Sequence, residues 1–234
     1  MIPIRDYLPT ERRPVVTVAI ILICIAVFVG ELARGEEGFT RAVYGLGMIP
    51  AVLTGEARLA PELALVPAWL TPLTSMFLHG GWLHLGGNML YLWIFGNNVE
   101  DRLGHLGFAL FYLGCGALAA LGHVLLDPTS RVPMVGASGA ISGVLAAYLV
   151  FFPRARVLVV VPIGFLFATH LPASLLLGFW FLLQFLSAVG SEPGTPGIAW
   201  WAHVAGFVAG LAVALLLRLR SHDRSARRRP GPWG

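Results

Sequence analysis

Four polar residues inside apolar stretches of the sequence are suited to nucleophilic catalysis. Ser138 stands in the run 136–139, at the predicted start of a helix, where free backbone N–H groups favour a developing anion. His203 lies in a later apolar stretch, and a histidine beside a serine supplies the base that makes the hydroxyl a nucleophile. His84 and Asn88 are four residues apart, hence on one helix face, and both side chains can donate to an oxyanion. This set predicts a serine nucleophile with a base and an oxyanion hole.

Each of these residues also has a purely structural explanation. Small residues around Ser138 let membrane helices approach closely, and taken alone this packing explanation is the better one. His203 could form an interhelical hydrogen bond without chemistry, and His84 with Asn88 could anchor the preceding loop. Their joint presence favours catalysis over packing.

The composition indicates a membrane protein. Of the 234 residues, 57% are hydrophobic and only 12% are charged, whereas soluble domains carry about 25% charged residues. The net charge of +4 comes largely from arginines between Arg218 and Arg229. A basic tail beside an apolar segment is typical of an anchor at anionic lipid, so we expect the lipid bilayer as a partner and no nucleic acid.

The apolar stretches predict an all-α membrane protein with six spanning helices. The first stretch lacks a convincing small-residue cleavage site, so we expect it to remain as an anchor. The uncharged stretch 63–99 is too long for one span and is broken by prolines and glycines, so 63–81 is predicted as a loop partly embedded in the membrane. The segment 157–169 is interpreted as a turn or interfacial segment. The six predicted spans are about 14–33, 82–99, 105–126, 138–152, 171–190 and 198–217.

The arginines orient these spans. With both termini inside, twelve arginines lie on the inner side and only Arg34, Arg41, Arg58 and Arg131 on the outer side, in agreement with the positive-inside rule. We therefore expect a cytoplasmic leader (1–14), a membrane domain (15–218) and a basic cytoplasmic tail (219–234).

This topology brings the four polar residues to one depth. The second, fourth and sixth spans all run inward, and the four residues lie in their first two turns, near the outer face. Close packing of the fourth and sixth spans is predicted by small residues at helical spacing, namely Gly139, Gly143 and Ala147 on one and Gly206 and Gly210 on the other. We expect Ser138 and His203 to meet where these two spans touch.

A metal site is the competing interpretation of His79, His84 and His203. No HExxH arrangement occurs at His79, and no carboxylate is predicted in the same layer. We therefore predict neither a metal nor another cofactor, and assign His79 to support of the loop. The serine does not stand in the Gly-x-Ser-x-Gly elbow of α/β-hydrolases either, because Ala140 occupies the last glycine position.

Three motifs in this order resemble the rhomboid family of intramembrane serine proteases. They are residues 79–88 (HGGWLHLGGN), 136–139 (GASG) and 202–210 (AHVAGFVAG), and the resemblance covers about residues 15–218. It implies a six-helix bundle and a catalytic dyad without metal. The implied roles are nucleophile for Ser138, general base for His203, and oxyanion hole for His84, Asn88 and the Ser138 N–H. Apart from the resemblance, we predict structural support by His79, Gly136, Gly139, Gly206 and Gly210.

The sequence departs from some family members at two positions. Trp69 is followed by Leu70 where those members have arginine, and Ser142 stands where they have an aromatic residue that stacks on the histidine. The histidine is then oriented differently, or by another aromatic residue. We interpret Trp180 and Phe181 as a lipid-facing or gating surface.

The sequence therefore predicts an enzyme that hydrolyses peptide bonds in or beside the membrane helix of single-span proteins, in a prokaryote-like plasma membrane. The main alternative is a catalytically silent rhomboid-like protein that binds membrane helices. A six-span transporter would place its ligands at mid-bilayer and show an internal repeat, and we find none. The oligomeric state and the physiological substrate are left open by the sequence.

Overall fold

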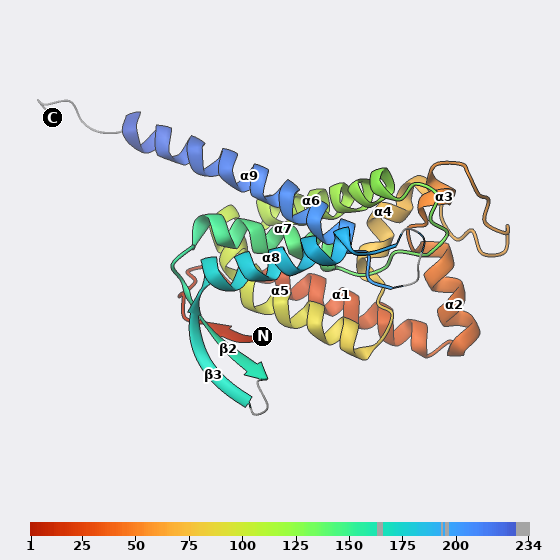
Figure 1. Ribbon diagram of the computed structural model, residues 1–234, viewed down its shortest axis with the longest axis horizontal. Helices are drawn as coiled ribbons and strands as arrows, with labels where there is room; N and C mark the ends of the chain where they lie inside the picture. The colour runs from red at the N-terminus through yellow and green to blue at the C-terminus, as the bar shows by residue number, and fades with distance from the viewer. Residues whose placement is uncertain (163–165, 193, 195–196, 228–234) are drawn as a thin grey trace, which may run out of the picture.

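Long helices form the body of the protein (Figure 1). The computed structural model describes residues 1–162, 166–192, 194 and 197–227, with the backbone alone described over 221–227. Helices occupy all six stretches in which we predict spans. They are α1 (Val15–Leu32), α5 (Trp82–Leu103), α6 (His105–Leu126), α7 (Ser138–Phe151), α8 (Ala173–Val189) and α9 (Trp200–Arg227).

Within the described residues, three helices are long and apolar enough to cross a membrane. These are α1, α6 and α9, the last over Trp200–Arg220. Helices α7 and α8 are apolar but shorter, and the last turn of α5 carries Glu100, Asp101 and Arg102. A crossing by all six helices stays a prediction. The helical part of α9 extends into the predicted basic tail 219–234, of which residues 228–234 lie outside the described part.

Helix α7 is the centre of the bundle. It packs against α9, α6, α5 and α8, and nearly all of its side chains are buried. Glycine and alanine at so many positions leave room for neighbours on every side, as in membrane helix interfaces. The start of α7, where Ser138 stands, is therefore held in place by the whole bundle.

Helices α7 and α9 pack with their backbones in close contact. A Cβ atom at Gly206 would collide with the backbone carbonyl of Gly139, and one at Gly210 would collide with the backbone of Gly143. These four glycines are the predicted small-residue faces, and only backbones without side chains can come this close.

A carboxylate of α5 holds the start of α1. Glu100 accepts hydrogen bonds from the backbone N–H groups of Val16 and Thr17, at 2.9 and 2.8 Å, and from the Thr17 hydroxyl at 2.7 Å. These N–H groups have no partner within their own helix, and a negative charge is favoured at a helix N-terminus. His105, at the start of α6, lies 2.6 Å from the same carboxylate. One side chain thus joins the ends of three helices.

The prediction of an all-α protein was wrong at one end of the bundle. A three-stranded antiparallel sheet, in the order β1-β2-β3, is formed by β1 (Ile2–Asp6), β2 (Arg156–Pro162) and β3 (Leu166–Pro172). It lies at the end of the bundle away from α2–α4 (Figure 1). The segment 157–169, interpreted as a turn or interfacial segment, is mostly strand, and residues 163–165 lie outside the described part.

The alternation of side chains explains this sheet. Val157 and Val159 are fully buried, whereas Leu158 and Val160 between them are partly exposed, which is the two-residue period of a strand. Because all of these residues are apolar, the period does not appear in the sequence as an alternation of polar and apolar types. Asp6 of β1 attaches the sheet to the helices by accepting from Asn98 at 2.7 Å and from the Tyr148 hydroxyl at 2.6 Å. Burial raises the pKa of Asp6 above its usual value, and the hydrogen bond from Tyr148 offsets part of this rise.

The connection between α1 and α5 contains several short helices. They are α2 (Gly35–Leu46), α3 (Pro50–Leu53), α4 (Thr71–Thr74) and the 3-10 turns Ala68–Leu70 and Ser75–Phe77. The last part of the predicted embedded loop, from Ser75 to His79, is mostly buried against the helices. Irregular backbone at membrane depth requires such cover by protein.

Candidate active site

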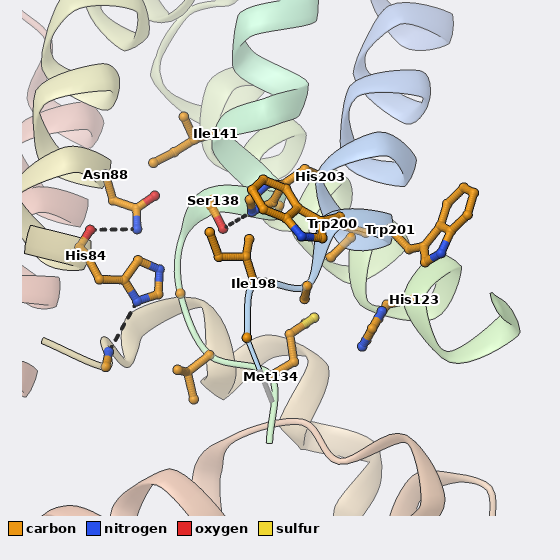
Figure 2. A pocket seen from close by; sticks show the side chains of 18 of the residues that line it. His84, Asn88, His123, Met134, Ser138, Ile141, Ile198, Trp200, Trp201 and His203 are labelled. Carbon is orange, nitrogen blue, oxygen red and sulfur yellow. Dashed lines mark hydrogen bonds between the residues drawn. The ribbon is translucent and has the colours of Figure 1, made fainter. Parts of the chain in front are cut away.

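A cavity of about 740 Å³ opens where α5, α7 and α9 begin and α6 ends (Figure 2). Its lining includes Ser138, His203, His84 and Asn88, the four polar residues that the sequence analysis places at one depth. Figure 2 shows their side chains gathered around the start of α7. A cavity of this size can hold a short peptide segment together with water.

Ser138 and His203 are in hydrogen-bonding contact. The Oγ atom of Ser138, the first residue of α7, lies 2.7 Å from Nε2 of His203, in the first turn of α9. This contact depends on the glycine packing of α7 against α9, which brings the first turns of both helices together. The geometry suits proton transfer from the hydroxyl to the imidazole.

The other ring nitrogen of His203 has a partner that the sequence analysis missed. Its Nδ1 atom lies 2.7 Å from Oε1 of Gln184 on α8. A signal existed in the sequence, because Gln184 is the one strongly polar side chain in the apolar stretch 173–189, and polar groups in membrane helices generally have a function.

Trp180, interpreted as lipid-facing or gating, contacts His203, and a gating role stays a prediction. Its indole ring is stacked on the His203 ring, with centroids 6.3 Å apart and planes at 28°, and it lines the cavity. Trp200 meets the same imidazole edge-on, at 6.0 Å and 86°. The aromatic neighbours of His203 thus come from α8 and α9. The Ser142 hydroxyl, one turn after Ser138, donates to the Ser138 carbonyl at 2.6 Å.

His84 is oriented as a donor toward the serine. The backbone N–H of Gly80 donates to its Nδ1 atom at 3.3 Å, so the ring proton belongs on Nε2. The Nε2 atom points toward the backbone before Ser138, since a Cβ atom at Gly136 would lie only 2.7 Å from it. Asn88 donates its side-chain N–H to the His84 carbonyl at 3.0 Å and turns toward the same space (Figure 2).

Gly136 is required by its backbone conformation as well as by space. Its φ of 121° is one that side-chain-bearing residues rarely adopt. Its N–H donates to the Ser75 carbonyl at 2.9 Å, which ties the segment before α7 to the buried loop. His79, at the end of that loop, is fully buried and packs edge-on against His84 at 5.2 Å. Its role in loop support stays a prediction.

Two features of the cavity wall complete the site. His123 of α6 also lines the cavity. Asp127 accepts a hydrogen bond from the Gly194 N–H at 2.8 Å and so joins the loop after α6 to the loop before α9.

In the described part of the chain, no three His, Cys, Asp or Glu side chains are grouped to hold a metal ion.

Comparison with known proteins gives the family. The Rhomboid domain matches residues 67–220, more than half of the chain. The chain is 30% identical over 184 residues to Rhomboid protein 1, mitochondrial, of Saccharomyces cerevisiae, covering 74% of this chain and 49% of that protein. It is 44% identical over 80 residues to Rhomboid-like protein 11, chloroplastic, of Arabidopsis thaliana, and the match covers 34% of this chain and 28% of that protein. It is 41% identical over 81 residues to Rhomboid protease GluP of Bacillus subtilis, and the match covers 35% of this chain and 15% of that protein.

The chain belongs to the rhomboid family. The match extends from the first-loop segment before α5 into α9 and therefore includes all the cavity-lining helices. Family membership and the apolar helices together support a multi-pass integral membrane protein. The matched region spans less than half the length of each of these relatives.

Proposed function

We propose that this protein is an intramembrane serine endopeptidase that cleaves single-span membrane proteins in or near their transmembrane helix. The observation that carries the proposal is the 2.7 Å contact between Ser138 Oγ and His203 Nε2 at the wall of a cavity. Membership of a family that includes a protein named as a rhomboid protease supports the same class of enzyme.

The reaction follows from the roles of these atoms. His203 Nε2 takes the hydroxyl proton while Ser138 Oγ attacks the substrate carbonyl, and the protonated imidazole then gives the proton to the leaving amine. A water molecule in the cavity, activated by His203, hydrolyses the resulting ester and frees Ser138. Neither step requires a metal or another cofactor.

The oxyanion formed in both steps needs donors beside Ser138. The candidates are Nε2–H of His84, the Asn88 amide and the Ser138 backbone N–H, which lies at the start of α7, where N–H groups lack helical partners. With these donors in place, the negative charge needs no metal ion to stabilise it.

We predict that His84→Ala and Asn88→Ala each lower kcat by on the order of 10²-fold while KM changes little, as expected for a lost oxyanion donor. Steady-state cleavage of a single-span reporter measures this effect. Trp93→Ala is the matched control, because Trp93 is on the same helix but is 57% exposed and does not line the cavity. Wild-type kcat in both variants would exclude these side chains from the oxyanion hole.

The proposal includes an orientation in the membrane. With both termini in the cytoplasm, twelve of the sixteen arginines lie on the inner side, and the cavity then faces the outer side of a plasma membrane. Its partners are transmembrane substrates and the surrounding lipid.

The deciding experiment compares the wild-type protein with Ser138→Ala in lipid vesicles. We expect the wild type to cleave a single-span reporter and to be labelled on Ser138 by a fluorophosphonate, and the variant to do neither while keeping its melting temperature. Cleavage by the Ser138→Ala protein would refute the serine nucleophile. A folded wild type that neither cleaves nor is labelled would favour the catalytically silent binder of membrane helices.

A further inference from the structure

The proposed mechanism needs His203 in one of its two neutral tautomers. Nε2 can accept the Ser138 proton only if it carries none itself, so the ring proton must sit on Nδ1. An Nδ1–H group away from water needs an acceptor, because an unpaired buried donor is costly. The Oε1 atom of Gln184, 2.7 Å from Nδ1, provides this acceptor.

We propose that Gln184 is a positioning residue that holds His203 in the Nδ1–H tautomer with Nε2 directed at Ser138. This inference rests on the proposed function, and it gives the dyad a third member on a third helix. Gln184 does not contact the reacting atoms, since it bonds to the ring nitrogen on the side away from Ser138.

Helix α8 supplies two contacts to the same imidazole. Trp180 and Gln184 are four residues apart and therefore lie on one face of the helix. Trp180 covers the flat side of the His203 ring, while Gln184 meets its edge at Nδ1. Together these contacts restrict both the tilt and the rotation of the ring. Ser142, one turn after Ser138, does not take part, because its hydroxyl bonds to its own helix backbone.

An amide oxygen has a different effect from the carboxylate of a triad. The amide oxygen accepts the hydrogen bond from Nδ1–H, and the amide dipole stabilises the imidazolium that forms when Ser138 attacks. The amide carries no net charge, however, and it binds no proton in the neutral pH range. Removing the oxygen should therefore impair the base, whereas replacing the amide by a carboxylate should keep the geometry and add charge stabilisation.

The test uses Gln184→Met, which has similar length but no strong acceptor, and Gln184→Glu, which keeps the acceptor. We expect Gln184→Met to lower kcat roughly 10- to 100-fold with KM unchanged, at the low end of what a positioned base contributes. We expect Gln184→Glu to keep kcat within about fivefold and to move the acidic limb of the pH–rate profile up by about one unit, because a nearby carboxylate favours imidazolium.

The other titratable groups around the cavity are the same in all these variants. They are His84, Tyr91, His123, Asp127 and Glu192. A shift of the acidic limb that appears only with Gln184→Glu is therefore due to the new carboxylate. Leu183→Ala is the matched control on α8, because Leu183 is adjacent in sequence and 45% exposed; its kcat and pH profile should match the wild type.

Imidazole ¹⁵N NMR separates this proposal from the proposed function. We expect the His203 signals, assigned by their loss in His203→Gln, to show Nδ1–H in the wild type and a mixture of tautomers in Gln184→Met, whether or not a substrate is cleaved. Three results in Gln184→Met would each overturn the positioning role. They are a kcat and pH profile equal to those of the wild type, a raised KM with unchanged kcat, and His203 tautomers that do not differ from those of the wild type. A wild type that shows Nδ1–H but neither cleaves nor labels would refute the protease function and leave the contact structural.

Discussion

Each of the variants Ser138→Ala and His203→Ala is expected to lower the rate of reporter cleavage by on the order of 10³-fold or more, and the double variant no further. The reason is that the 2.7 Å contact makes one catalytic unit of the two side chains. Without His203 the hydroxyl keeps its proton, and without Ser138 the imidazole has no hydroxyl to activate. Single-turnover cleavage in vesicles, compared among the three variants, measures this coupling.

A double variant much slower than either single one would contradict the dyad, because independent contributions multiply. Fold integrity is checked by the melting temperature of each variant, and Ser191→Ala is a control that removes another serine hydroxyl from the wall of the same cavity. That hydroxyl donates to the Ala188 carbonyl at 2.8 Å and does not bond to His203, so we expect near wild-type rates.

Gly206→Ala is expected to destabilise the protein by roughly 1 to 3 kcal/mol, the usual cost of overpacking a tight interior, and to lower kcat by on the order of 10²-fold. The added methyl group would collide with the Gly139 carbonyl, one residue after Ser138, and must push α9 away from α7. His203 moves with α9, and a misplacement of about 1 Å in a catalytic group can cost 10²-fold in rate.

The control for this prediction is the same substitution at a glycine with open space. A Cβ atom at Gly114 of α6 would meet nothing within 4 Å, so Gly114→Ala should raise stability by up to about 1 kcal/mol through helix propensity alone. Thermal unfolding in detergent and the rate of fluorophosphonate labelling give the two readouts. If both alanine variants behave alike, the close contact of α7 and α9 is not what positions the site.

The positions of the long helices could be predicted because the signal is local. Each apolar stretch carries its own length and boundaries, and a membrane requires that backbone groups be paired within the helix. The glycine faces of α7 and α9 could be predicted for a similar reason, since Gly139, Gly143, Gly206 and Gly210 recur at the four-residue spacing of a helix surface.

The sheet could not be predicted in this way. Strand β2 alternates between buried and exposed valines and leucines, but every residue of Val157–Val161 is apolar, so the two faces look alike in the sequence. Its pairing with β1 joins residues more than 150 positions apart, Ile2 with Val160. Such a contact depends on where the helices bring the chain ends, which no local pattern contains.

For the site, the local sequence predicts which residues stand at the starts of three helices: His84 and Asn88 on α5, Ser138 on α7 and His203 on α9. The surroundings of the imidazole depend on how the helices pack. The sequence of α8 marks Gln184 as a polar residue in an apolar helix, but it does not show which residue of the bundle Gln184 meets. Packing against α9 turns Trp180 and Gln184 toward His203. The identity of the polar residues is thus a local property of the chain, whereas their orientation follows from the rotation of each helix within the bundle.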